Sequence, residues 1–306
     1  SNIYQVPIML DNQGVTRMLS ERFGFNLPDE RKLLEDWKRM ADHVDSLEKA
    51  EEIHIAVAGK YTDLADSYLS VIKALQHASF KVNRKLVIDW IESSDLDEEA
   101  KESDPDSHES AWELLKSANG ILVPGGFGIR GIEGKIKAAE YARLNKVPYL
   151  GVCLGLQVAT IEFCRNVLGL EGANSTEFEE DSKNPAVVFM PEISKTHMGG
   201  TMRLGTKPTP FLVDDCKMRR LYGGGSYVDE RHRHRYEVNP ELISDIEGAG
   251  LVFVGKDETG ERCEIMELEG HPYYVGTQYH PEFKSRPDRP SPPFLGLLKA
   301  AAGQEI

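Results

Sequence analysis

The sequence predicts an α/β fold: a doubly wound, mainly parallel sheet with helices on both of its faces. Two patterns support this prediction. Between residues 53 and 167, short β-branched runs alternate with segments of helical period. These runs are mostly apolar and too continuous for a half-exposed sheet, which is typical of strands that are buried on both faces in a parallel sheet. In such a sheet the active site lies at the carboxyl ends of the strands.

The elements can be assigned in chain order. Strands are expected at residues 53–58, 86–91, 120–123 and 148–152, each followed by a helix, at residues 66–80, 109–118, 135–144 and 154–167. After Gly172 the pattern becomes irregular, with short strands expected at residues 186–190, 251–255, 263–268 and 273–278. The acidic stretch from Glu92 to Glu109 is expected to be a solvated loop without a function.

The first fifty residues have a different character. Apolar residues recur at helical spacing between Pro28 and Ala50, which predicts one amphipathic helix that serves as a linker. The stretch from Ile3 to Leu10 is too short to form its own core, so we expect it to be the end of an upstream domain. Because the chain also begins without a methionine, we expect a piece of a longer protein. The predicted division is residues 1–50 as tail and linker helix, and 51–306 as the main domain.

The composition of the chain argues against several classes of binding partner. The formal net charge of −14 and the isoelectric point near 5.2 argue against binding to nucleic acid or to anionic lipid. The four cysteines lie far apart without a CxxC pair, so neither a zinc ribbon nor a disulfide framework is expected. No apolar run approaches the roughly 20 residues of a membrane span. We therefore expect a cytoplasmic protein with no nucleic-acid or membrane partner.

The segment PYLGVCLGLQ places Cys153 between a buried strand and a helix. Gly-x-Cys-x-Gly at such a junction is the cysteine form of the nucleophile elbow. The sulfur then lies at a helix N-terminus, where unpaired amides and the helix dipole favour the reactive thiolate. A buried structural cysteine is the alternative. Cys164, inside the apolar helix and without flanking glycines, is predicted to be a packing residue.

A nucleophile of this kind needs a base, and the segment QYHPE directly follows a predicted strand. Residues two apart in extended backbone project to the same side, so Glu282 can reach the ring nitrogen of His280 that faces away from the sulfur. Cys153, His280 and Glu282 would then form a triad. A histidine after a strand is more often a hydrogen-bonded surface residue, and it is the joint occurrence with the elbow that favours catalysis.

The loop VPGGFGIRG, residues 123–131, follows another buried strand. Its two consecutive glycines let backbone amides approach a ligand closely, as an oxyanion hole requires, and the amide of Leu154 would supply the second donor. A plain turn and a phosphate loop are the alternatives. Neither this loop nor residues 58–62 contain the Walker pattern, so no ATP site is visible.

The run RHRHR, residues 231–235, could be mistaken for a nucleic-acid patch or a metal site. In a strand the arginines share one face and the histidines the other. Only His232 and His234 remain as possible ligands, which is too few for zinc. We therefore expect no metal site.

Several motifs carry a family resemblance. PGGFG, GVCLGLQ and HPEF, in this order, resemble the triad glutamine amidotransferases. The narrower resemblance is to the CTP synthase family, whose C-terminal half is similar to this chain in GKYTDLADSYLSVIKAL, ILVPGGFGIRG, PYLGVCLGLQ, NSTEF, GGTMRLG, ERHRHRYEVNP and QYHPEF. The first fifty residues resemble the end of the synthetase domain and its linker helix, while the ATP- and UTP-binding body of that domain is absent.

The resemblance implies a role for each motif. Cys153 is expected to attack the side-chain amide of glutamine, His280 to transfer protons and Glu282 to orient His280. Gly126 and Leu154 would provide the oxyanion amides. Arg130 would belong to a lid, similar to the loop through which CTP synthases respond to GTP. The substrate-binding residues implied by the family pattern are Gly126, Phe127, Gln157, Glu177, Arg235 and Tyr236. A carboxylate and a guanidinium are also what the two charged ends of an amino acid require.

The implied function is hydrolysis of L-glutamine to glutamate and ammonia through a γ-glutamyl thioester. The absent synthetase half would use the ammonia to aminate UTP to CTP with ATP. No cofactor is expected in this domain, whereas the full-length enzyme would use ATP and Mg, respond to GTP as activator and form a homotetramer. The alternatives are a stand-alone γ-glutamyl hydrolase, which can share the triad, and a regulatory or assembly module. The presence of all three triad residues argues against the second.

Overall fold

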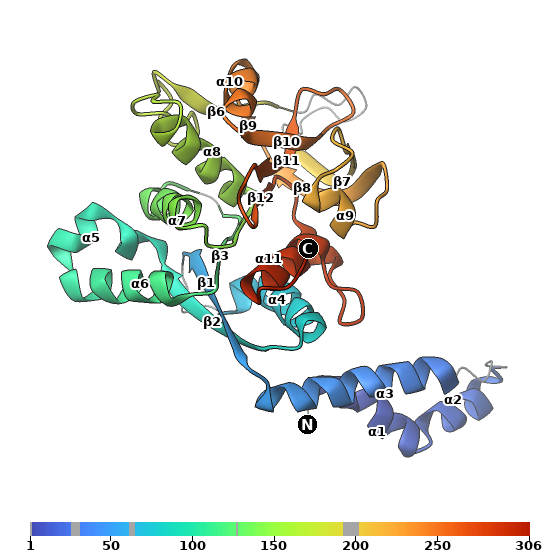
Figure 1. Cartoon of the computed structure of the whole chain (residues 1–306). Coiled ribbons are helices and arrows are strands. Elements are labelled where there is room, and N and C mark those ends of the chain that lie inside the picture. The colour runs from blue at the N-terminus through green and yellow to red at the C-terminus, as the bar shows by residue number, and fades with distance from the viewer. Residues whose placement is uncertain (1, 26–30, 61–64, 127, 192–201) are drawn as a thin grey trace.

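Figure 1 shows a computed structural model of the chain, which describes all residues except 1, 26–30, 61–64, 127 and 192–201. Its centre is a seven-stranded sheet in the order β10-β11-β12-β4-β3-β1-β2. Strands β2, β1, β3, β4 and β12 run parallel, and β11 and β10 are antiparallel to their neighbours. Their bounds are β1 Glu52–Gly59, β2 Lys85–Glu92, β3 Gly120–Val123, β4 Tyr149–Val152, β10 Leu251–Lys256, β11 Cys263–Leu268 and β12 Tyr274–Thr277. The predicted mainly parallel α/β sheet is confirmed.

Helices cover both faces of this sheet and bury two apolar layers against it (Figure 1). Strand residues alternate between the layers: Ile121 and Val123 of β3 face one, and Leu122 faces the other. The first layer is covered by α6 Pro105–Ser117, α7 Ile132–Asn145, α8 Leu154–Asn166 and α10 Ile243–Gly248. The second is covered by α4 Leu69–Val82, α9 Lys217–Leu221 and α11 Pro292–Ala301.

The acidic stretch 92–109 is not a loop, and that prediction is wrong. It forms a 3₁₀ turn, Ser93–Leu96, then α5 Glu98–Ser103 and the first turn of α6. Local capping supports α6 in spite of the charge, and acidic residues in the first turn of α5, Glu98 and Glu99, suit the positive end of its dipole. The Asp104 carboxylate accepts a hydrogen bond from the Ser107 amide, and Pro105 occupies the first position of α6, where its missing N–H costs nothing.

Two smaller sheets lie beside the central one. One consists of β5 Asn174–Ser175, β6 Pro185–Phe189 and β9 Tyr236–Val238, and the other is the antiparallel pair β7 Arg203–Pro210 and β8 Tyr227–His234. The pair was not expected, because Pro208 and Pro210 interrupt β7 and β8 is rich in charge. Along β8, buried and exposed residues alternate strictly, which places a histidine face inward and an arginine face outward.

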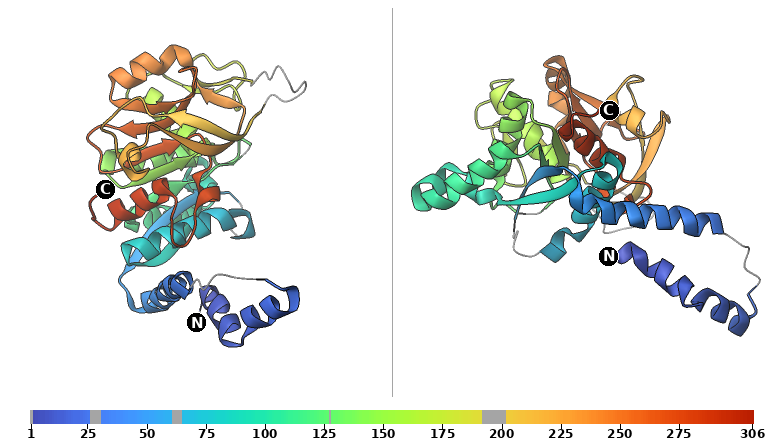
Figure 2. Two further views of the ribbon diagram at one scale, coloured as in Figure 1. Left: turned by 90° about the vertical axis from the view of Figure 1, so that its right-hand side faces the viewer. Right: turned by 60° about the horizontal axis from the view of Figure 1, so that its bottom comes forward.

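The amphipathic helix predicted between Pro28 and Ala50 is present as α3 Arg31–Ser46. Among the described residues before it, α1 Val6–Asn12 and α2 Val15–Phe23 were not predicted, and these helices lie outside the layers of the main fold (Figures 1 and 2). Tyr4 joins them to the rest, because its ring contacts both Trp37 of α3 and Phe80 of α4. His43 adds a hydrogen bond of 2.9 Å to the Phe80 carbonyl. Among the helices that the structure describes, none combines the length and apolar character of a membrane span.

The turn between β4 and α8 packs against β3 with almost no space. A Cβ atom at Gly155 would lie 2.1 Å from the carbonyl oxygen of Val123, and one at Gly151 would lie 2.5 Å from the backbone of Gly155. Both contacts are with backbone atoms, which cannot rotate away. The two glycines therefore set how closely the start of α8 approaches the sheet.

We predict that Gly155→Ala destabilises the fold by about 2 kcal/mol, because the added methyl group forces α8 away from β3. The matched control is Gly248→Ala, at the end of α10, where the space around a new Cβ is open. The control is expected to be neutral or slightly stabilising. Urea unfolding of both variants checks this. Equal stability of the two would contradict the packing argument.

Candidate active site

Cys153 occupies the turn between β4 and α8 in a backbone conformation that side-chain-bearing residues rarely adopt, with φ 53° and ψ −99°. It is the N-cap of α8, and its own amide donates to the Thr277 carbonyl of β12 at 2.6 Å. The side chain is 7% exposed. The elbow expected from the glycine pattern is thus present in the backbone, and strain of this kind is typical of functional sites.

His280 and Glu282 follow β12, the neighbour of β4 in the sheet. The His280 Nδ1 atom lies 2.9 Å from a carboxylate oxygen of Glu282. The contact between His280 and Glu282 was predicted, but on the assumption that residues 280–282 are extended. In the structure His280 instead caps a 3₁₀ turn, Pro281–Lys284, and the turn brings Glu282 back to the ring. The His280 amide also donates to the Arg231 carbonyl of β8 at 2.8 Å, which fixes the base from a second side.

The electrostatics of His280 favour its charged form. Burial of the ring opposes the imidazolium, but the charge and hydrogen bonding of Cys153 and Glu282 outweigh burial and raise the pKa of His280. An imidazolium beside the sulfur favours the thiolate, which is the nucleophilic form of cysteine. The arrangement is therefore suited to proton exchange between sulfur and ring.

The glycine turn after β3 borders the same sulfur. A Cβ atom at Gly125 would lie 2.8 Å from the His280 ring and 3.4 Å from the Cys153 Cβ, so only glycine fits between them. Gly126 lies next to Leu154, because a Cβ atom there would be 3.7 Å from the Leu154 side chain. The Leu154 amide is the first of α8 and has no acceptor within the helix. The structure thus brings together the two residues predicted to form an oxyanion hole.

A pocket opens on one side of Cys153. It is lined by Gly126, Cys153, Leu154, Gln157, Glu177, Arg233, His234, Arg235 and Tyr236. All of the predicted substrate-binding residues that the structure describes therefore lie around one cavity. Phe127, the remaining one, lies outside the described residues. A second cavity, on the His280 side, shares Gly126, Cys153 and Arg233 with the first.

Charges of both signs meet at the wall of this pocket. Burial raises the pKa of Glu177, and the positive charges of Lys60 and Arg235 oppose that shift. Burial in turn lowers the pKa of Lys60, with Glu177 acting in the opposite direction. Lys60 also donates to the Gly128 carbonyl at 2.6 Å, so it connects this wall with the glycine turn. Sequence patterns gave Lys60 no role.

Lys135 is a second cation that the sequence did not assign to the site. Its side chain is almost fully buried, and its Nζ atom would lie 3.6 Å from a Cβ atom at Gly126. Burial and the neighbouring Lys60 lower the pKa of Lys135 to about 7, against the opposing influence of Glu92 and Cys153. Only the fold reveals this position, because in the sequence Lys135 is one more charged residue at the start of a helix.

Arg130, the predicted lid residue, lies on the surface before α7 and forms an ion pair of 3.6 Å with Glu92 at the end of β2. Ile132 and Lys135, which follow it, are buried in α7. Among the described residues, any lid around Arg130 ends close by, because α7 begins two residues later at Ile132.

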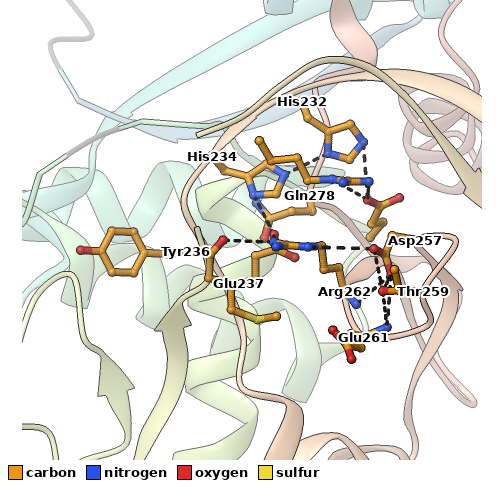
Figure 3. A network of polar contacts seen from close by, with 12 residues as sticks. His232, His234, Tyr236, Glu237, Asp257, Thr259, Glu261, Arg262 and Gln278 are labelled. Atoms are coloured by element: carbon orange, nitrogen blue, oxygen red, sulfur yellow. Dashed lines mark hydrogen bonds and ion pairs between the residues drawn. The ribbon is translucent and has the colours of Figure 1, made fainter. Parts of the chain in front are cut away.

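The inward face of β8 carries a buried polar network, shown in Figure 3. His232 Nδ1 lies 2.9 Å from His234 Nε2, and burial lowers the pKa of both rings, so the pair is neutral near pH 7. Glu264 receives two hydrogen bonds from Arg203, and Glu237 pairs with Arg262. Within the described residues, no cluster of three or more His, Cys, Asp or Glu side chains could hold a metal ion. These histidines thus anchor β8 and its outward arginines.

Comparison with known proteins places this site in a family. Residues 63–300 match the family described as glutamine amidotransferase class-I. The chain is 53% identical over 307 residues to CTP synthase 1 of Homo sapiens, covering 99% of this chain and 51% of the relative. It is 54% identical over 317 residues to CTP synthase of Dictyostelium discoideum, covering 98% of this chain and 55% of the relative. The chain thus spans about half the length of the curated relatives it matches.

A solved structure covers the same half. The glutaminase domain of the Trypanosoma brucei CTPS, with bound acivicin, superposes with a TM-score of 0.75 at 37% identity, over 83% of this chain and 95% of that one. The sequence motifs, the fold and this match agree. The chain therefore belongs to the class-I glutamine amidotransferases, within the group formed by the glutaminase domains of the CTP synthases.

Proposed function

We propose that this chain hydrolyses L-glutamine to glutamate and ammonia, with Cys153 as nucleophile, His280 as proton carrier and Glu282 as the residue that orients His280. The observation that carries the proposal is the strained elbow at Cys153, with the His280–Glu282 pair in the turn that follows the adjacent strand β12. The alternative of a stand-alone γ-glutamyl hydrolase is not favoured, because the match to CTP synthases extends over 99% of the chain.

The proposed first step forms a thioester. The Cys153 thiolate attacks the amide carbon of glutamine, and the negative charge moves to the carbonyl oxygen, where the amides of Gly126 and Leu154 stabilise it. The intermediate collapses as His280 gives a proton to the departing nitrogen, which leaves as ammonia. Water then attacks the thioester while His280 accepts a proton from it, and glutamate leaves as the thiolate is restored.

The proposed recognition of glutamine uses both charges on the pocket wall. Glu177 would accept from the α-ammonium group, and Arg235 would bind the α-carboxylate. Tyr236 lines the pocket, and Gln157 has only its side-chain oxygen left for the ligand, since its amide nitrogen already donates to Tyr236 and Gln278.

In the full-length protein, the ammonia would be used by a synthetase domain to aminate UTP to CTP with ATP and Mg. Supporting this, the relatives that match are CTP synthases of roughly twice this length. Apolar side chains such as Met9, Met18 and Phe23 are exposed on the N-terminal helices, which fits a segment that packs against such a domain. A homotetramer and a cytoplasmic location belong to the same proposal. The four free cysteines fit a reducing compartment.

We predict that Cys153 alkylates faster than the other three cysteines. Burial raises the pKa of Cys164 to about 12 and that of Cys216 to about 11, and it also raises the pKa of Cys263, so these thiols stay protonated near neutral pH. Mass spectrometry after brief treatment with iodoacetamide checks the order.

The matching kinetic prediction is that Cys153→Ala lowers glutaminase turnover by at least about 10⁴-fold. Cys164→Ala, which removes a buried thiol from the same α8, is the control and retains turnover. Full activity of the Cys153 variant, or first labelling of Cys164, would rule out the assigned nucleophile.

A pH dependence of substrate binding follows from Glu177. Burial raises its pKa, so on acidification it protonates earlier than an ordinary glutamate. The neutral form cannot pair with the ammonium group, and KM for glutamine should therefore rise as the pH falls. Glu177→Gln should raise KM about tenfold near neutrality and remove this acid dependence. Steady-state kinetics between pH 5 and 8 test both points, and an unchanged acid limb in the variant would exclude Glu177 as the ammonium partner.

We further propose that GTP activates the full-length enzyme through the loop that carries Arg130. The Arg130–Glu92 pair would be exchanged for contacts with the nucleotide, and activation requires that GTP binds the closed loop more tightly than the open one. The synthetase domain would form the other wall of that pocket.

This predicts that GTP stimulates glutaminase activity strongly in the full-length protein and weakly in the present chain. Arg130→Ala should reduce the stimulation far more than the basal rate, whereas Lys183→Ala, another exposed cation, should leave both unchanged. GTP titrations of both proteins provide the measurement. Equal, strong stimulation of the two would show that the GTP site lies wholly within this chain.

A further inference from the structure

The sulfur of Cys153 has a neighbour that the proposed mechanism does not use. The side-chain nitrogen of Gln278 lies 3.5 Å from Cys153 Sγ, within the range of a hydrogen bond to sulfur. Gln278 is the residue that follows β12 and is completely buried. Its backbone amide donates to the Glu264 carbonyl of β11 at 2.9 Å, so the main chain that carries this side chain is fixed. Figure 3 shows Gln278 with the polar network around Glu237 and His234.

The orientation of the Gln278 amide follows from its other contact. A side-chain nitrogen of Gln157 donates to the Tyr236 carbonyl at 2.8 Å, and a carbonyl can only accept, so this end of Gln157 must be the NH₂ group. The same nitrogen lies 3.3 Å from Gln278, which must therefore present its oxygen. The NH₂ group of Gln278 is then the end that faces the sulfur. The Tyr236 carbonyl can only accept, so it fixes the direction of the hydrogen bonds that lead from Gln157 through Gln278 to the sulfur.

A buried N–H donor aimed at a sulfur stabilises the thiolate more than the thiol, because hydrogen bonds to charged groups are the stronger ones. Two cations act on the same sulfur: His280, from the turn after β12, and Lys135, from α7. Gln278 differs from both, because its donor carries no proton that titrates. It can support the thiolate before attack on the substrate, and again when the thiolate leaves the thioester.

We propose that Gln278 is a further catalytic residue, which donates a hydrogen bond to the Cys153 thiolate and so increases the thiolate fraction near neutral pH. This inference rests on the proposed function only in taking Cys153 as the nucleophile.

The test is the pH dependence of Cys153 alkylation by iodoacetamide, followed by mass spectrometry of the peptide that contains Cys153. Gln278→Met keeps the size and removes the donor. Gln278→Glu keeps the size and places a carboxylate beside the sulfur. The control is Thr160→Val, which removes a buried polar group of α8 whose hydroxyl donates to the Leu156 carbonyl at 3.0 Å rather than to the sulfur. Circular dichroism and thermal unfolding establish that each variant is folded.

The expected order of pH midpoints is wild type, then Gln278→Met, then Gln278→Glu. The midpoint of the methionine variant should lie about one pH unit above that of the wild type, which is roughly tenfold slower labelling below the midpoint. Glutaminase kcat should fall in both variants, and KM should change little in Gln278→Glu, which keeps an oxygen that can accept from Gln157 of the pocket. Thr160→Val should keep the wild-type midpoint.

An unchanged midpoint in folded Gln278→Met would overturn the inference, and so would equal shifts in Gln278→Met and Thr160→Val. If Gln278→Met fails to fold, Gln278→Leu replaces it as the variant without a donor, because a carboxylate would raise the midpoint by its charge alone. The proposed function is tested separately, since it fails only if Cys153→Ala retains glutamine hydrolysis.

Discussion

The turn between β4 and α8 holds Cys153 at a positive φ, and the geometry of the whole site depends on that turn. Such a conformation costs about 1–3 kcal/mol and persists only where the surroundings enforce it. Three contacts enforce it here: Gly155 against β3, Gly151 against Gly155, and the hydrogen bond from the Cys153 amide to Thr277. All three involve β4 and its two neighbours in the sheet, β3 and β12. This junction positions the sulfur, the first amides of α8 and the glycine turn after β3.

The surroundings of the pocket are rich in positive charge, whereas the chain as a whole is negatively charged. The protein carries a formal charge of −14, yet Lys60 and Arg235 lie near Glu177 and Lys135 lies near Cys153. Because two of these are lysines with lowered pKa values, the local positive charge decreases as the pH rises, while the arginine remains charged. A carboxylate ligand therefore meets a basic region that is hidden from anionic macromolecules at the surface.

The sequence was sufficient for the strands between Glu52 and Val152, because each centres on a short, mostly apolar run that alternates with a segment of helical period. It failed for α5, whose residues are charged on every side, and for the β7–β8 pair, where prolines interrupt the pattern. The sequence also does not reveal contacts between residues that are far apart along the chain. Lys135 lies outside every motif, and Lys60 and Gln278 lie in motifs that assigned them no role. Only the fold places Gln278 at the sulfur, Lys135 beside Gly126 and Lys60 against the Gly128 carbonyl. The predicted oxyanion and substrate residues do meet in space, although their roles remain predictions.

The two halves of the proposed site belong to different sheets. Cys153 and His280 follow β4 and β12, which are paired directly with Val152 opposite Thr277. The backbone pairing of two central strands thus sets the positions from which the sulfur and the imidazole extend. Glu177 and Arg235, by contrast, adjoin the small sheet of β5, β6 and β9, which lies against α8. The wall proposed to bind the two charged ends of an amino acid is therefore built on a different sheet from the nucleophile and base, so a change of substrate preference could arise there while the paired strands under the triad stay the same.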